Sequence, residues 1–234
     1  TKASWSNSVS LGSRATGVVS TVVTALASNQ THYFAFYASN SVGQTWATPS
    51  LSFATPSQPA VTSSSASVIG ATSATFNGNL TSTGGTSTRV WLFWGTTDGG
   101  AVKASWTNQA LLGYRPVGAV STGLTSLTPN TIYYYRYYAS NTWGDAWGAP
   151  SISLLTLSAP AIANTGASSI APTNATLAGN LTLTGSVPTF VWVFYGITDG
   201  GTTKASWSNS VSLGSRATGA VSTVVNSLAS DQTY

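Results

Sequence analysis

Only a few side chains in this 234-residue sequence belong to the types that carry out chemistry. There is one histidine, His32, and no glutamate or cysteine. Acid–base and nucleophilic catalysis need such groups in oriented pairs, and glycoside hydrolysis needs two facing carboxylates. The aspartates instead fall singly in predicted turns and loops. We therefore expect no catalytic residue, no cofactor site, no metal site and no enzymatic activity. The four carboxylates are Asp98, Asp145, Asp199 and Asp231.

The composition narrows the range of partners. Eight Lys or Arg and four Asp give a formal net charge of +4, but the cations are scattered singly along the chain. A nucleic-acid interface needs basic residues gathered on one face, so we do not expect nucleic acid as a partner. No apolar run approaches the roughly 18 residues of a membrane-spanning helix, so we expect no membrane insertion. Nine Trp, ten Tyr and many β-branched residues favour packed sheets.

A repeat organises the whole sequence. The tetrapeptide Lys-Ala-Ser-Trp occurs at Lys2–Trp5, Lys103–Trp106 and Lys204–Trp207, which gives a period of 101 residues. The Asp-Gly-Gly segment at Asp98–Gly100 recurs at Asp199–Gly201 with the same spacing. Self-similarity at a fixed period is the sequence signature of a repeat architecture, which a solitary enzyme domain does not need.

Alternate repeats are more alike than neighbours. Residues 1–32 and 203–234 differ at only five positions, whereas residues 102–133 match the first segment at about half of theirs. This pattern indicates a two-domain unit that was duplicated along a longer array.

The local patterns indicate strands and no helix. Apolar residues alternate with polar ones, between Gly, Pro, Asn and Ser, and a 3.6-residue period is missing. In the middle repeat this alternation places Ala74, Phe76, Gly78 and Leu80 on one face. The Asp-Gly pair at 98–99 is a hairpin signal, because such a turn needs a positive φ. The expected strands open at 59–61 and continue at 74–80, 89–95, around Trp106, and at 120–127, 132–141 and 147–157.

Seven short strands in about one hundred residues are typical of an immunoglobulin-like sandwich. A Leu-Thr-Pro-Asn-Thr-Ile-Tyr segment, with Leu127, Pro129 and Tyr133 at its key positions, resembles the corner of fibronectin type III domains. The resemblance implies that the Tyr133 hydroxyl ties this corner back to the backbone. It also implies that alternate residues of 90–94 face the core. The first repeat departs from the family, because His32 stands where the corner Tyr is expected.

The resemblance, extended over the period, implies an all-β chain of tandem seven-stranded immunoglobulin-like, fibronectin type III-like sandwiches. Pro-containing junctions would divide it into three parts. Residues 1–56 would be the C-terminal half of one domain, residues 57–157 a complete domain, and residues 158–234 the N-terminal part of a third. We interpret the chain as a segment of a longer array, whose end parts are completed either by the same polypeptide or by another one.

An aromatic strip is predicted on the outer face of one sheet, where strands normally present polar residues to water. Three interpretations are open: the strip packs against another chain or a neighbouring domain, it is a flat platform for carbohydrate, or loops or the next domain cover it as extra core. Contiguous exposed aromatics usually mark an interface. The strip comprises Trp91, Phe93, Tyr134, Arg136 and Tyr138, with Trp192 and Phe194 in the following repeat.

These features predict a structural protein. We expect a non-catalytic, bacterial repeat array that forms an extracellular filament, stalk or adhesin shaft at the cell surface, with the aromatic strip as its self-association contact. The alternative is a carbohydrate-binding or spacer module attached to a secreted enzyme. A further loop, residues 141–147, carries Trp143 at one end of the predicted sandwich.

Overall fold

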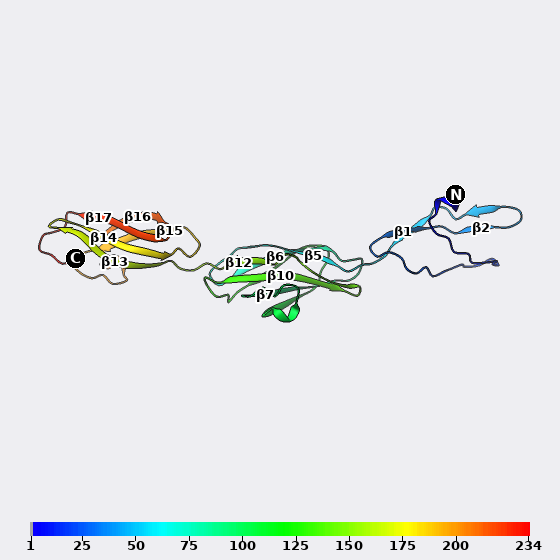
Figure 1. The fold of residues 1–234 in the computed structure, drawn as a ribbon, viewed down its shortest axis with the longest axis horizontal. Helices are drawn as coiled ribbons and strands as arrows, with labels where there is room; N and C mark the ends of the chain where they lie inside the picture. Colours follow the sequence, from blue (N-terminus) through cyan, green and yellow to red (C-terminus); the bar gives the residue numbers. More distant parts are fainter. Residues whose placement is uncertain (1) are drawn as a thin grey trace.

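The chain folds entirely as β-structure. The computed structural model describes residues 2–234, which form seventeen strands and three single-turn 3-10 helices. Three groups of strands follow one another along the longest axis of the molecule, with the chain ends in the two outer groups (Figure 1). The all-β fold predicted from the sequence is confirmed. No helix within residues 2–234 is long and apolar enough to span a membrane.

The central group is a two-layer antiparallel sandwich. Its strands are β5 (Ala60–Ser67), β6 (Ala74–Ser82), β7 (Arg89–Gly95), β8 (Asn108–Tyr114), β9 (Gly118–Leu124), β10 (Ile132–Asn141), β11 (Gly144–Trp147) and β12 (Ile152–Leu155). One sheet has the order β5-β6-β9 and the other β11-β10-β7-β8. β12 pairs with the beginning of β10 and β11 with its end. This two-layer arrangement is that of the immunoglobulin-like sandwich. It has eight strands and not the predicted seven, because the single strand expected at 147–157 is divided between β11 and β12.

The outer groups contain parts of similar sheets. The N-terminal strands are β1 (Thr31–Phe34), β2 (Tyr37–Ser39), β3 (Gln44–Trp46) and β4 (Leu51–Ala54), paired as β1-β4 and β2-β3. The C-terminal strands are β13 (Ala161–Ala171), β14 (Asn174–Leu183), β15 (Thr189–Tyr195), β16 (Asn209–Arg216) and β17 (Gly219–Asn226), paired as β13-β14-β17 and β15-β16. The 3-10 helices are η1 (Lys2–Ser4), η2 (Lys103–Ser105) and η3 (Lys204–Ser206).

Two local predictions are wrong at the connection between β7 and β8. Residues Lys103–Ser105 form η2 where a strand was expected around Trp106, because the Trp106 indole turns back and is buried against the sheet. The Asp-Gly pair does not close a tight hairpin either. The Asp98 carboxylate accepts a hydrogen bond from the Gly100 N–H at 2.9 Å, Gly100 takes the positive φ of 57°, and the connection continues through residues 96–107.

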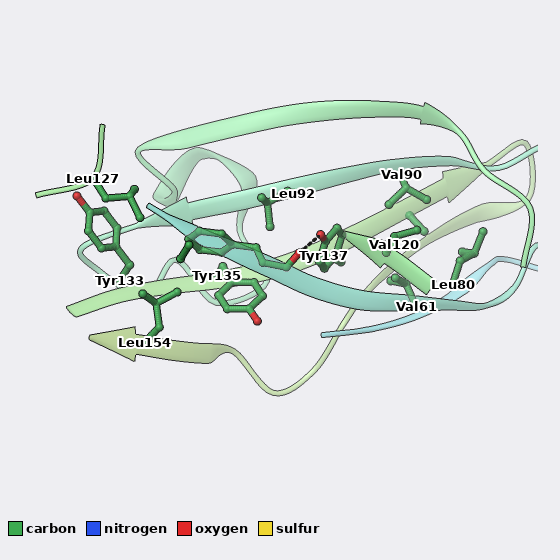
Figure 2. Packing of buried hydrophobic residues seen from close by; sticks show 13 residues of the cluster. Val61, Leu80, Val90, Leu92, Val120, Leu127, Tyr133, Tyr135, Tyr137 and Leu154 are labelled. Atoms are coloured by element: carbon green, nitrogen blue, oxygen red, sulfur yellow. Dashed lines mark hydrogen bonds between the residues drawn. The ribbon is translucent and has the colours of Figure 1, made fainter. Parts of the chain in front are cut away.

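Two tyrosines occupy the middle of the core. Tyr135 and Tyr137 are fully buried and lie among aliphatic side chains of both sheets (Figure 2). The Tyr137 hydroxyl donates a hydrogen bond to the Phe76 carbonyl at 2.8 Å, and the Tyr135 hydroxyl donates one to the Ser64 carbonyl. A buried hydroxyl costs free energy unless it is bonded, so both rings fill the core while their polar ends are satisfied.

The pKa values of these tyrosines predict how stability depends on pH. Burial raises the pKa of Tyr135 from 10.0 to about 12, and burial also raises the pKa of Tyr137. Above pH 10 the unfolded chain loses these protons first, so the free energy of unfolding should fall as the pH rises from about 10 to 12. Urea denaturation at a series of pH values measures this fall. Tyr135→Phe should make the fall shallower, and equal slopes in the variant and the wild type would contradict the assignment.

The predicted corner is held by a backbone contact. The Tyr133 hydroxyl accepts a hydrogen bond at 3.0 Å from the backbone N–H five positions earlier, and Tyr234 accepts the equivalent bond at 2.8 Å. Leu127 is buried in the core next to this corner, whereas Pro129 is exposed. In the first repeat the Nε2 atom of His32 lies 3.3 Å from a carbonyl oxygen, also five positions earlier. The histidine thus makes a structural contact at the tyrosine position.

Candidate interaction surface

The strip residues of the central sandwich lie on the outer face of β7 and β10. In the register of these strands Trp91 is opposite Tyr138, and Phe93 is opposite Arg136. The face is as predicted, but the expected exposure is wrong for three members: Phe93, Arg136 and Tyr138 are only 2%, 8% and 3% exposed. Trp91 and Tyr134 are half-buried. Most of this strip is therefore not free to stack on a ligand.

The strip is covered by other parts of the same polypeptide. The Trp106 indole is buried against it, with 7% of its surface exposed, and Trp147 on β11 packs with its ring centroid 5.0 Å from Phe93 and 4.9 Å from Tyr138. The Lys103 ammonium lies 3.9 Å above the Tyr138 ring, a cation–π contact. These residues form a second apolar core, which we call the outer aromatic cluster. Its members are Phe93, Trp106 and Tyr138, with Trp91, Tyr134 and Trp147 partly buried against them.

The covering connection is fixed by its own hydrogen bonds. The Trp106 indole N–H donates to the Gly100 carbonyl at 3.2 Å. The Asp98 carboxylate, besides its turn contact, accepts a hydrogen bond from the Ser151 hydroxyl at 2.7 Å. A Cβ atom on Gly99 would lie 2.6 Å from the Trp106 ring, so only glycine permits this close approach. Asp98 therefore fixes this turn and connects it to Ser151.

The cluster is built the same way in the N-terminal strands. Lys2 lies 4.0 Å above the Tyr37 ring, and the Tyr37 and Trp46 rings are 5.0 Å apart. Trp5, from the first Lys-Ala-Ser-Trp motif, stacks on Trp46 with a centroid distance of 6.2 Å. The repeated tetrapeptide thus supplies a lysine and a tryptophan that cover the aromatic face of their own sheet.

The C-terminal strands repeat the covering connection. The Trp207 indole donates to the Gly201 carbonyl at 3.1 Å, and Lys204 lies 5.4 Å from the Trp192 ring. Trp192 is 45% exposed here and Phe194 is half-buried, on a strand that pairs with β16. These two predicted strip residues are thus more accessible than their counterparts in the central sandwich.

Arg136 supports the cluster from within the sheet. Its Nε–H donates to the Gly148 carbonyl at 3.0 Å, and its guanidinium lies 5.6 Å from the Trp147 ring. A buried guanidinium needs such partners, because an unpaired charge is costly to remove from water. Residues 2–234 contain no group of three His, Cys, Asp or Glu side chains that could hold a metal ion. The contacts within the outer aromatic cluster are apolar and cation–π contacts.

The sequence reasoning missed the residues that cover the strip, Lys103, Trp106 and Trp147. A signal for two of them was present, because the Lys-Ala-Ser-Trp motif recurs three times with a fixed spacing to the aromatic strands. A tryptophan that recurs at the same position of every repeat, outside the aromatic strands, indicates a buried contact for the segment that carries it.

Comparison with known proteins gives a distant structural likeness. No protein-family model matches the sequence, and no curated protein matches it. Among solved structures, the chain is similar to the crystal structure of the FN1–FN3 domains of chicken CNTN1, with 14% sequence identity and a TM-score of 0.36. The likeness covers 88% of this chain and 67% of that one. The sandwich architecture follows from the strand pairing and the buried core alone.

Proposed function

We propose that this chain is a structural, non-catalytic spacer: part of an array of fibronectin type III-like sandwiches that forms an extracellular filament, stalk or adhesin shaft. The units of the array would be residues 1–56, 57–157 and 158–234. The observation that carries the proposal is the way the short junctions between strand groups are bonded to the neighbouring sandwich.

The first junction is fastened at two points. The Ser57 N–H donates to the Gly84 carbonyl at 2.9 Å, and the Asn141 amide donates to the Ser57 carbonyl at 2.8 Å. The second junction repeats the backbone contact, with the Ser158 N–H 3.3 Å from the Gly185 carbonyl. Junctions that are short and bonded restrict hinge motion, so an array of such units behaves as a semi-rigid rod.

The aromatic strip has a reduced role in this proposal. Its buried members stabilise each sandwich, so lateral contacts between rods would use the accessible aromatics, among them Trp91, Tyr134 and Trp192. Such contacts would give self-association into filaments or bundles. The alternative of a carbohydrate platform on the strip is disfavoured, because the covering connection occupies the face on which a sugar ring would stack.

Gly84 gives a specific test of junction stiffness. It has a φ of 64°, and a Cβ atom there would lie 2.0 Å from the Ser57 carbonyl oxygen, so Gly84→Ala should push the junction off the sandwich. Small-angle X-ray scattering of the 234-residue chain should show a rod, and the variant should show a broader, more bent ensemble. Gly85→Ala is the control, since φ is 80° there but the nearest junction atom is 3.9 Å away. Equal scattering from both variants, or a flexible wild type, would contradict the spacer proposal.

A further inference from the structure

A cleft between the N-terminal strands and the central sandwich has the chemistry of a saccharide site. It measures about 490 Å³, within the range of small-molecule sites, which is roughly 300–1,000 Å³. The aromatic residue on its wall is Trp143, which is 60% exposed. The wall also carries neutral hydrogen-bonding side chains from both strand groups and from the junction, among them Ser28, Asn29, Gln58 and Ser82.

The backbone of Trp143 is held in place, and its side chain is exposed. It lies at the tip of the β10–β11 hairpin, whose last pair is Asn141 with Gly144. The Asn141 side-chain oxygen accepts the Trp143 N–H at 2.8 Å, and its amide donates to the carbonyls of Ser57 and Thr83, both at 2.8 Å. One asparagine therefore fastens the hairpin tip to the junction and to a neighbouring loop. Little backbone ordering is left to a ligand that binds there, which favours affinity.

The wall chemistry selects a neutral ligand with many hydroxyl groups. No ionisable side chain is among the described residues that line the cleft, so phosphate, nucleic acid and metal ions find no counter-charge. Asn29 and Gln58 provide amides that donate and accept together, which matches a hydroxyl group. A single indole face suits the apolar face of a sugar ring, whereas a quaternary ammonium group is recognised by a cage of several aromatics.

The two repeat types differ at the position of Trp143. Val42 occupies the position of Trp143 in the preceding repeat and is 93% exposed, so the indole is not a requirement of the hairpin. The exposed Trp143 indole is thus accessible to a ligand in the cleft. We propose that this inter-sandwich cleft binds a neutral saccharide, with Trp143 as the stacking platform and Asn29 and Gln58 as hydroxyl partners. This goes beyond the proposed spacer function.

The test follows the Trp143 indole N–H signal by NMR in the 234-residue chain. Soluble oligosaccharides of glucose, mannose and N-acetylglucosamine are titrated separately, with inorganic phosphate as the charged probe. At least one saccharide should shift the signal to saturation, and phosphate should not. Trp143→Ala should weaken that binding, measured by calorimetry, by at least about tenfold, the size of one well-buried aromatic contact. Gln58→Ala should weaken it to a smaller extent.

Leu111→Ala is the matched control, since this side chain is apolar, 57% exposed and not among the lining residues. It should bind as the wild type does. The proposal is overturned if no saccharide of the panel shifts the Trp143 signal, if phosphate alone does, or if Trp143→Ala binds with unchanged affinity. The scattering test of the junction does not use a Trp143 variant. Its result can therefore contradict the spacer function without contradicting the saccharide site, and the saccharide titration can do the reverse.

Discussion

Replacement of Phe93 by alanine is expected to destabilise the central sandwich by about 3–5 kcal/mol, the usual cost of removing a buried aromatic ring. Phe93 is 2% exposed and packs against Trp147 and Tyr138 in the outer aromatic cluster. Its loss would leave a cavity beside Tyr138 and Trp147. Native-state hydrogen exchange of the amides of β7 and β10 measures the change in this sandwich separately from the other strand groups.

Leu111→Ala supplies the comparison on the same sheet. Leu111 is the register partner of Trp91 and is 57% exposed, so its truncation should change stability by less than about 0.5 kcal/mol. If strip residues were simply a solvent-facing contact platform, Phe93→Ala would be equally mild. A small effect of Phe93→Ala would therefore reject the buried position of this ring.

Gly78→Ala is expected to destabilise the same sandwich by about 1–3 kcal/mol, the range for overpacking a filled core. A Cβ atom on Gly78 would lie 2.4 Å from the Tyr137 ring and 2.7 Å from the Thr62 carbonyl oxygen. The Tyr137 ring is fully buried, and the Thr62 oxygen belongs to the backbone of β5, so neither can move aside cheaply. Urea denaturation followed by near-ultraviolet circular dichroism, which reports packed tyrosines, measures the loss.

Gly123→Ala is the matched control in the neighbouring strand. A Cβ atom on Gly123 would meet no atom within 4 Å, and its backbone does not have a positive φ. Alanine there should be neutral or slightly stabilising, because it restricts the unfolded chain. Equal destabilisation by both substitutions would mean that the loss comes from strand backbone effects, and not from the approach of the Tyr137 ring.

The sheets were predictable because burial on one face imposes a period of two. Ala74, Phe76 and Leu80 alternate as expected and are all buried in β6. The bounds of β7 and β10 agree with the predicted segments 89–95 and 132–141. In β7 and β10 most residues are apolar or aromatic on both faces, so the run predicts that the segment is a buried strand.

Strand periodicity could not predict whether the outer face of the sheet is covered or exposed to solvent. Alternation correctly places Phe93 and Tyr138 on the sheet face that points away from the core. It does not predict which residues cover that face. The cover comes from a connection with no period of its own, in which one glycine contact and one indole hydrogen bond set the position of Trp106. Contacts of this kind depend on three-dimensional closeness between strand and loop, which alternation along a strand does not encode.

The most direct test of this view is hydroxyl-radical footprinting of the wild-type chain and of Gly99→Ala. The substitution places a Cβ atom 2.6 Å from the Trp106 ring and should lift the covering connection off the sheet. We expect Phe93 and Tyr138 to be protected in the wild type at every protein concentration, with Trp143 strongly labelled. In Gly99→Ala, Phe93 and Tyr138 should become reactive. Labelling of Phe93 and Tyr138 as strong as that of Trp143 in the wild type would show an open aromatic face and contradict the account.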